Sequence, residues 1–152
     1  MTIPQFGEHD AGRDYPDRPA AFAIIEEGGK IACVEVAWRN GGRKLDLPGG
    51  GIDPGESAAE AAERECGEEA GLKVAVTAEP FARADHYFVN TEGKRNNTRG
   101  QFFEARLEGE APELKIEDDH RLLWLEPLEA IRRFDRDSHA WAVVAWLRQG
   151  EA

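Results

Sequence analysis

The chain of 152 residues has the length of one ordinary domain, and 41% of its residues are hydrophobic, so it can form a core and is not disordered by composition. Nineteen lysines and arginines against 30 aspartates and glutamates give a net charge of −11, which argues against a protein that binds a nucleic-acid backbone non-specifically. The longest apolar run, 140–147, is far shorter than the ~20 residues of a membrane span, and no signal peptide is visible, so we expect a cytoplasmic protein without membrane contact.

The N-terminal third has the pattern of a polar segment followed by short strands. Residues 1–18 are polar and irregular and are predicted to form an arm, with a single domain over 19–152. Strands are expected at 20–25, 31–38 and 45–47. The Gly28-Gly29 pair between the first two favours a hairpin.

A glycine-rich loop at 48–55 then leads into a helix. Ser57 is a suitable N-cap, and Glu60 three residues later completes a capping box. The predicted helix covers 58–70 and ends at Gly71, a residue type that favours the left-handed conformation of a helix end.

The C-terminal half alternates further strands with two helices. We expect strands at 72–76, 81–89, 101–107 and 122–125, a short helix at 128–134, and a last helix capped by Ser138. The polar stretch 90–100 is predicted to be a hairpin loop. Because no regular βαβ repeat is present, this order predicts an α/β protein in which a mixed sheet lies between helices, an α/β/α sandwich.

Three glutamates of the 58–70 helix share one face. At 100° per residue, Glu65, Glu68 and Glu69 project within an arc of about 100°. Like charges at these spacings destabilise a helix by a few tenths of a kcal/mol per pair, and a divalent cation with oxygen ligands would remove that repulsion. From the spacing alone, a solvated acidic face and a metal site both remain open.

The glutamates belong to a longer pattern. From Gly50 the sequence reads Gly, five residues, Glu56, seven residues, and then Arg64-Glu65-Cys66-Gly67-Glu68-Glu69-Ala70-Gly71-Leu72. Over 23 residues this resembles the Nudix box, the signature of the Nudix hydrolase family, and the rest of the chain resembles small bacterial MutT-like members. Cys66 stands where the family usually has an aliphatic residue, which a small and apolar buried Cys can replace.

The resemblance implies a Nudix fold, with the glycine loop and helix as its box, and hydrolysis of a pyrophosphate bond with Mg²⁺ or Mn²⁺. By position, Glu65, Glu68 and Glu69 are the implied metal ligands, completed by a backbone carbonyl at Gly49 or Gly50.

The two charged box residues outside this ligand set have implied positioning roles. Arg64 matches the family's box arginine, which positions carboxylates and is expected to act in catalysis. Glu56 is expected to hold the loop against Arg64.

Candidate residues outside the box are less specific. Glu117 is the predicted general base, since some relatives contribute a carboxylate there, while Asp118, Asp119 and a solvated acidic loop remain alternatives, as does His120. Predicted substrate-binding residues are Arg18 before the first strand, Tyr87 on a strand, and Arg95 and Arg99 in the basic 90–100 stretch.

The family's markers of substrate subgroup lie about fifteen residues past the box. There the chain reads Asp85-His86-Tyr87-Phe88, without the proline of ADP-ribose hydrolases and with Tyr87 close to the tyrosine of dinucleoside polyphosphate hydrolases. We therefore rank nucleoside triphosphates first, including modified ones, then dinucleoside polyphosphates, ADP-ribose and nucleotide sugars. The expected partner is a small nucleotide and not a nucleic-acid polymer. A homodimer remains open, as does a non-catalytic Nudix-like sensor domain.

Overall fold

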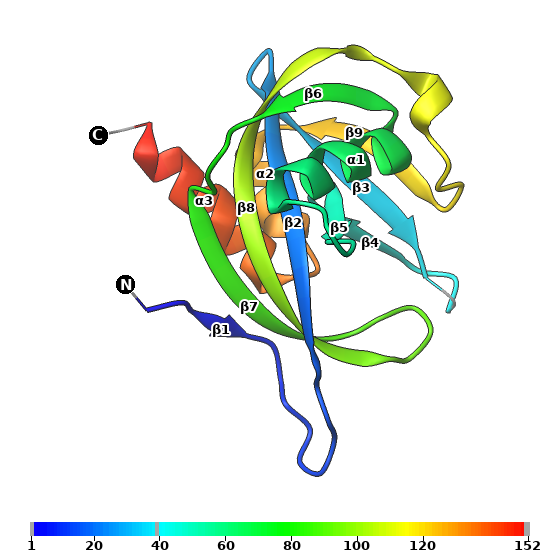
Figure 1. Ribbon diagram of the computed structural model, residues 1–152, viewed down its shortest axis with the longest axis vertical. Helices are drawn as coiled ribbons and strands as arrows, with labels where there is room; N and C mark the ends of the chain where they lie inside the picture. The colour runs from blue at the N-terminus through cyan, green and yellow to red at the C-terminus, as the bar shows by residue number, and fades with distance from the viewer. Residues whose placement is uncertain (1, 39, 151–152) are drawn as a thin grey trace.

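The computed structural model describes residues 2–38 and 40–150, so Met1 of the predicted arm and the last two residues of the predicted domain lie outside it. Its strands are β1 (Gln5–Phe6), β2 (Asp17–Glu27), β3 (Lys30–Ala37), β4 (Arg43–Asp46), β5 (Gly49–Gly51), β6 (Leu72–Val76), β7 (Ala82–Val89), β8 (Arg95–Glu110) and β9 (His120–Leu125). Its helices are α1 (Ala58–Ala70), α2 (Pro127–Arg133) and α3 (Asp137–Gln149), with a 3₁₀ turn, η1, at Pro112–Leu114 (Figure 1).

The described strands form one mixed sheet in the order β1-β7-β8-β2-β3-β4, with β5 paired to β2, β6 to β8 and β9 to β3. Its centre is the parallel pair of β2 and β8, in register from Asp17 opposite Asn97 to Ile25 opposite Ala105. The other pairs are antiparallel except for β1 with β7. The predicted mixed sheet is confirmed.

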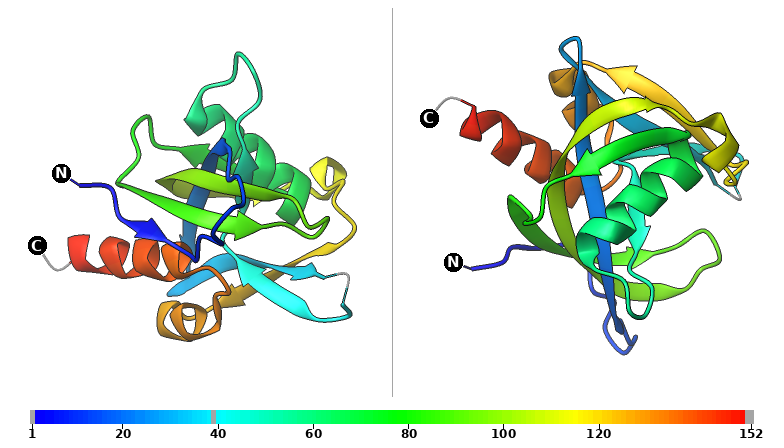
Figure 2. Two further views of the ribbon diagram at one scale, coloured as in Figure 1. Left: turned by 90° about the horizontal axis from the view of Figure 1, so that it is seen from below. Right: turned by 45° about the horizontal axis from the view of Figure 1, so that its top comes forward.

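Alternation along β2 divides the core into two layers. Phe22 and Ile24 face the layer that contains α2 and α3, whereas Ala23 and Ile25 face the layer beneath α1. Figure 2 shows α1 on one side of the sheet and the two C-terminal helices on the other, which is the predicted α/β/α arrangement. Cys66, on α1, is fully buried between this helix and the sheet, as expected of an apolar substitute at this position.

The helix that carries the box glutamates begins and ends where its local signals predict. The Ser57 side chain accepts from the Glu60 N–H, and the Glu60 carboxylate accepts from the Ser57 N–H, so the capping box is complete. Gly71 closes the helix at φ 66°. These caps fix the position of the acidic face relative to the glycine loop.

Two sequence predictions are wrong in their boundaries. The stretch 90–100 is a tight turn only as far as Lys94, after which β8 begins at Arg95. Asn96, Asn97 and Thr98 are polar but buried, because backbone pairing with β7 and with β2 holds this segment inside the sheet. Ser138 does not cap the last helix: it is buried within α3, and Arg136 is the N-cap residue, without a capping hydrogen bond from its side chain.

The arm and the glycine loop are also more ordered than their sequences suggest. The segment 2–18 contributes β1 and the first residues of β2, so Arg18 lies in a strand rather than before one. The glycine loop contains β5, which pairs with β2. Both cysteines are free and buried. Among the described residues, no helix has the length and apolar character needed to cross a membrane.

Candidate active site

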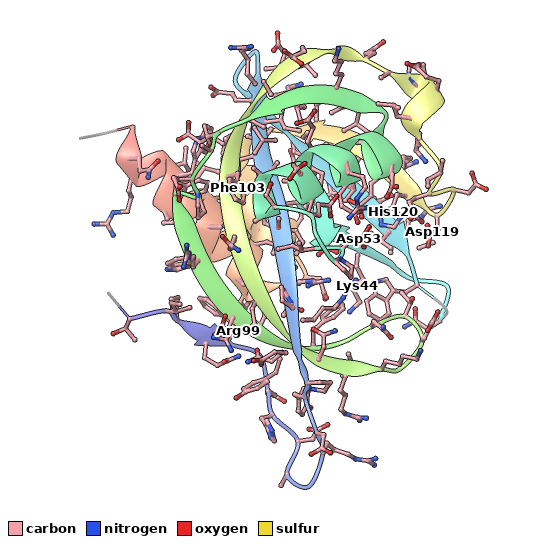
Figure 3. All side chains as sticks on the ribbon, viewed as in Figure 1. Lys44, Asp53, Arg99, Phe103, Asp119 and His120 are labelled. Carbon is pink, nitrogen blue, oxygen red and sulfur yellow. The ribbon has the colours of Figure 1, made fainter. Side chains whose placement is uncertain are left out.

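A cavity of about 280 Å³ lies beside the box helix. Its walls come from β2, β3, β5 and α1, from the turn between β7 and β8, from the segment before β9 and from the residue before α3. Glu65, Glu69, Glu117 and His120 all line it. Figure 3 shows the labelled Asp119 and His120 next to α1, so the acidic helix and the segment before β9 meet at this point.

Glu69 is the most buried carboxylate of the cavity, with its side chain 10% exposed. The Gly49 N–H donates to its Oε1 at 3.0 Å, and His120 Nε2 lies 3.2 Å from its Oε2. Burial raises the pKa of Glu69 to about 7 against the opposing effects of His120 and the Gly49 N–H. A carboxylate desolvated in this way favours a nearby cation.

Arg64 holds the box carboxylates in place with every nitrogen of its guanidinium. Nε and Nη2 donate to Glu56 at 2.8 and 3.0 Å, and Nη2 also donates to the Gly51 carbonyl at 3.0 Å. Nη1 donates to Glu65 at 3.0 Å and to Glu68 at 2.9 Å. The Arg64 hydrogen bond lowers the pKa of Glu56. This geometry supports positioning roles for both Arg64 and Glu56.

Glu65 and Glu68 accept from the same nitrogen of that guanidinium, Nη1, but line different hollows of the surface. Glu65 faces the cavity against Gly50, and burial raises its pKa in spite of Arg64. Glu68 instead lines a groove on the outer side of α1. Of the three glutamates predicted to share a metal, the structure therefore places Glu65 and Glu69 on the wall of one cavity, while Glu68 lines the neighbouring groove and is joined to Glu65 through Arg64 Nη1.

Gly49 is required by close packing as well as by its backbone conformation. It has φ +150°, and a Cβ there would lie 2.2 Å from the Ala21 carbonyl oxygen and 2.6 Å from Phe22 Cα. Because both atoms are backbone, β5 cannot accept a side chain at this position without moving away from β2. The N–H that binds Glu69 would move with it.

We expect Gly49→Ala to destabilise the fold by about 2 kcal/mol and to lower kcat/KM at least tenfold through displacement of Glu69. Gly109→Ala is the matched control, because a Cβ there meets nothing within 4 Å. Chemical denaturation and steady-state kinetics measure both effects. Wild-type stability and activity in Gly49→Ala would contradict this role of β5.

The segment before β9 and the first residue of that strand bring a second group of side chains that could hold a metal ion to the cavity. Glu117, Asp119 and His120 offer ligand atoms within 4.8 Å of one another. The Glu117 N–H donates to the Glu68 carbonyl at 3.0 Å, which fixes this segment to the end of α1. Burial alone would lower the pKa of His120, but Glu69 and Asp119 together raise it to about 9.

Only one of the four predicted substrate-binding residues lies at the cavity. Arg18 lines the cavity, but Tyr87, Arg95 and Arg99 do not. Tyr87 packs against the N-terminal segment, with ring centroids 5.1 Å from Tyr15, and Arg95 lies 3.7 Å from Asp10. Arg99 pairs with Asp17 and Asp85, far from Asp119 and His120 in Figure 3. The roles predicted for these three residues stay untested, and their placement gives them no support.

The cavity residues that sequence reasoning did not identify include Trp38, Asp46, Phe88 and Arg136. For Phe88 a signal existed, since alternation places it on the opposite face of the strand from Tyr87. Arg136 had none, because no local pattern marks an arginine before a helix as a pocket residue.

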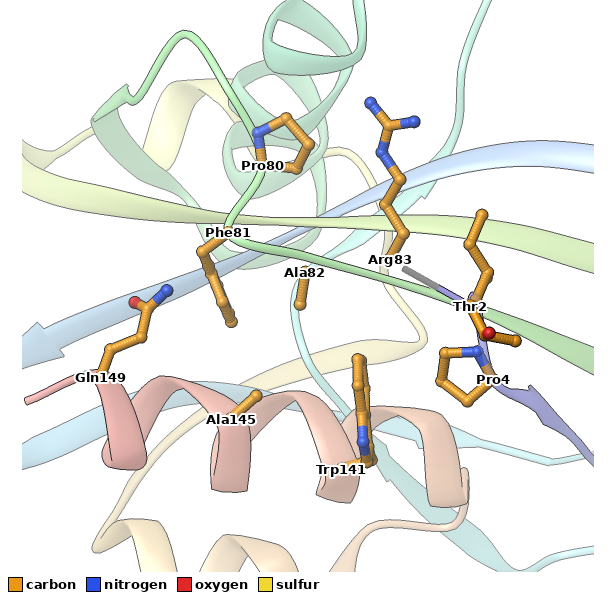
Figure 4. A pocket seen from close by; sticks show the side chains of 10 residues that line it. Thr2, Pro4, Pro80, Phe81, Ala82, Arg83, Trp141, Ala145 and Gln149 are labelled. Atoms are coloured by element: carbon orange, nitrogen blue, oxygen red, sulfur yellow. The ribbon is translucent and has the colours of Figure 1, made fainter.

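Another cavity, of about 550 Å³, lies between the N-terminal segment, the start of β7 and α3 (Figure 4). Its lining is mostly apolar and includes Phe81 and Trp141, and Arg83 is its one charged residue among those described. It offers no carboxylate, so it lacks the groups that metal-assisted hydrolysis needs.

Comparison with known proteins agrees with the fold and the box. The family profile of the NUDIX domain matches residues 16–147. The chain is 30% identical over 118 residues to an RNA pyrophosphohydrolase of Agrobacterium fabrum, covering 68% of this chain and 69% of that protein. This chain therefore belongs to the Nudix family.

Solved structures of the same fold include a NUDIX hydrolase from Nitrosomonas europaea, with a TM-score of 0.75 and 22% identity over 88% of this chain and 90% of that one. A MutT protein from Methanosarcina mazei aligns with a TM-score of 0.71 and 20% identity over 93% and 100% of the two chains. The family matches confirm the predicted enzyme class, a Nudix pyrophosphohydrolase. They do not determine its substrate.

Nudix enzymes typically use a divalent metal, and the residues of this cavity fit one. Its donors are carboxylate and carbonyl oxygens, the ligands that Mg²⁺ and Mn²⁺ prefer. Burial also raises the pKa values of Glu65 and Glu69, and a cation bound between them would offset the cost of desolvating their charged forms.

Proposed function

We propose that this protein hydrolyses a pyrophosphate bond in a nucleoside diphosphate derivative, with Mg²⁺ or Mn²⁺ as cofactor. Glu65, Glu69 and the Gly50 carbonyl would hold the metal, and Glu68 would serve a second ion or support Arg64. The observation that carries the proposal is the burial of Glu69 in a cavity shared with Glu65 and Glu117.

The metal, when bound, neutralises phosphate charge and lowers the pKa of a coordinated water. The protein's own groups do the positioning: Arg64 orients Glu65 and Glu68, and the Gly49 N–H orients Glu69. Glu117 is the proposed general base. Its carboxylate accepts no hydrogen bond from the described residues, whereas both ring nitrogens of His120 already face carboxylates, at 3.2 Å from Glu69 and 2.9 Å from Asp119.

For the substrate we propose a nucleoside triphosphate or a modified one, ahead of dinucleoside polyphosphates, ADP-ribose and nucleotide sugars. Tyr87 gives no support to a dinucleoside polyphosphate, because that residue does not line the cavity. The Agrobacterium relative is named for RNA, so RNA carrying a 5′-triphosphate belongs among the substrates tested. The net charge of −11 supports a small nucleotide over a long polymer.

The alternative is a Nudix-like domain that binds nucleotides without catalysis. Such a domain is expected to lack box carboxylates, and here all four are present. Arg64 orders Glu56, Glu65 and Glu68, and the Gly49 N–H orders Glu69. This favours an active enzyme.

We expect the purified protein with Mg²⁺ to release phosphate or pyrophosphate from at least one nucleotide, to lose that activity in EDTA and to regain it with excess Mg²⁺. The measurement is kcat/KM across the four substrate classes and 5′-triphosphorylated RNA. Folded protein that cleaves none of them would favour the non-catalytic alternative. A preference for ADP-ribose of more than about tenfold, or ~1.4 kcal/mol in transition-state binding, would contradict our substrate ranking.

A further inference from the structure

Arg136 carries a buried guanidinium whose hydrogen-bonding capacity is unused. Its side chain is 11% exposed, and its Nε is fully buried without a hydrogen-bond partner among the described residues. Its Cζ lies 3.6 Å from the ring centroid of Phe88 and 5.8 Å from that of Phe22, so one face of the guanidinium covers an aromatic ring. Its donors can therefore bind a ligand only at the edge of the guanidinium plane.

The nearest carboxylate does not satisfy this group. Asp46 Oδ1 lies 3.6 Å from Arg136 Nε, which is beyond a hydrogen bond, and this oxygen is itself buried and unpaired. His139 adds no charge, because its Nδ1 accepts from the Leu47 N–H at 3.0 Å and burial lowers its pKa well below the usual value. Arg136 is thus a buried cation with one carboxylate within 4 Å, and its hydrogen-bond donors have no acceptor among the described residues.

A second arginine faces the same cavity. Arg18 on β2 makes no hydrogen bond or ion pair with the described residues, and its guanidinium packs against Gly51. Burial lowers the pKa of Arg136, the carboxylates of Asp46, Asp135 and Glu69 oppose this effect, and the nearby charge of Arg18 adds to it. Two like charges that line one cavity repel each other, and a polyanion between them removes that repulsion.

The glycines of β5 connect these cations to the carboxylates. Gly49 binds Glu69, Gly50 packs against Glu65 and Gly51 packs against Arg18. A substrate whose reacting phosphates lie at Glu65 and Glu69 would thus reach the arginines with the next group of its chain. An anionic group would use the free guanidinium donors best, because hydrogen bonds between charged partners are roughly twice as strong as those between neutral ones.

We propose that Arg136, together with Arg18, binds a phosphate of the substrate beyond the two joined by the cleaved bond. This inference rests on the proposed hydrolysis and narrows it to substrates with three or more phosphates. A neutral base is the poorer fit for Arg136, because the Phe88 face on which a base could stack is already covered by the guanidinium. ADP-ribose, with two phosphates, would leave both arginines unsatisfied.

The first test uses inorganic triphosphate and thermal unfolding, which require no catalysis. With Mg²⁺ present, triphosphate should raise the Tm of the wild-type protein above its value with Mg²⁺ alone. Arg136→Gln should lose most of that shift, whereas Arg132→Gln, on the exposed surface of α2, should keep it. An equal shift in wild type and in folded Arg136→Gln would overturn the inference.

The second test separates a phosphate contact from a base contact. Arg136→Gln should raise KM for nucleoside triphosphates at least tenfold and change kcat less than threefold, with the same factor for all four bases. A change confined to the preference among bases would show that Arg136 reads the base and would overturn the proposal.

If Arg136→Gln does not fold, Arg136→Lys can be used in its place. Lysine retains the positive charge but lacks the two parallel N–H donors with which a guanidinium binds one phosphate. It should raise KM at least threefold, because an ammonium group cannot donate in the bidentate geometry. A KM equal to that of the wild type would contradict the proposal. If the wild-type protein hydrolyses none of the nucleotides, the proposed function is refuted. The Tm experiment would still show whether Arg136 binds a phosphate group.

Discussion

Replacing Glu69 by glutamine is expected to lower kcat more than tenfold while the protein stays folded. Glutamine has nearly the same shape, and its Oε1 can still accept from the Gly49 N–H, so β5 keeps its partner. The change removes the most buried negative charge of the cavity, and with it a metal-directed ligand that supports several kcal/mol of transition-state stabilisation. Steady-state kinetics at saturating Mg²⁺, with circular dichroism as a check of folding, measures the effect.

Glu63→Gln is the matched control, because Glu63 is on the same helix but exposed and outside the cavity. It should retain wild-type turnover. If Glu69→Gln and Glu63→Gln turn over substrate equally well, Glu69 is not part of the catalytic site.

Arg64→Ala is expected to reduce both activity and stability. The variant loses every hydrogen bond that joins Glu56, Glu65, Glu68 and the Gly51 carbonyl, so the carboxylates repel one another and lose their fixed orientation. We expect kcat/KM to fall more than tenfold. The free energy of unfolding should fall by about 1–3 kcal/mol, a modest range because Arg64 is partly exposed and its ion pairs are screened by solvent.

Arg64→Lys separates charge from geometry. Lysine keeps the positive charge but cannot donate to four acceptors at once, so the variant should recover part of the stability and little of the activity. Full activity in Arg64→Lys would show that a positive charge alone is sufficient for catalysis. The guanidinium hydrogen bonds would then not be needed to position the carboxylates.

Local signals account for what the sequence predicted well. The helix at 58–70 has its capping residues and its C-terminal glycine within a few positions of its ends, so its bounds follow from neighbouring residues. The spacing of the box likewise brought Glu65 and Glu69 to one cavity, because positions four apart share a helix face. The mixed sheet and the helices on both of its faces followed from the order of the elements.

Contacts between distant parts of the chain account for the features that the sequence did not predict. Asn96, Asn97 and Thr98 have the composition of a loop, but they are buried in β8, which lies between its hairpin partner β7 and the strand β2, distant in sequence. Tertiary pairing overrides local polarity in such a segment. The contact of Glu65 and Glu68 with one nitrogen of Arg64 depends on where the Arg64 side chain lies. The approach of Arg136 to Phe88 depends on how α3 packs on β7. Neither contact has a signature in a single sequence.

Equilibrium binding of Mn²⁺ tests most directly whether the box carboxylates form a metal site. The free-ion electron paramagnetic resonance signal should decrease on titration with wild-type protein, and the dissociation constant should rise at least tenfold in both Glu65→Gln and Glu69→Gln, with Glu63→Gln unchanged. Wild-type affinity for Mn²⁺ in a folded Glu65→Gln/Glu69→Gln double variant would contradict this account.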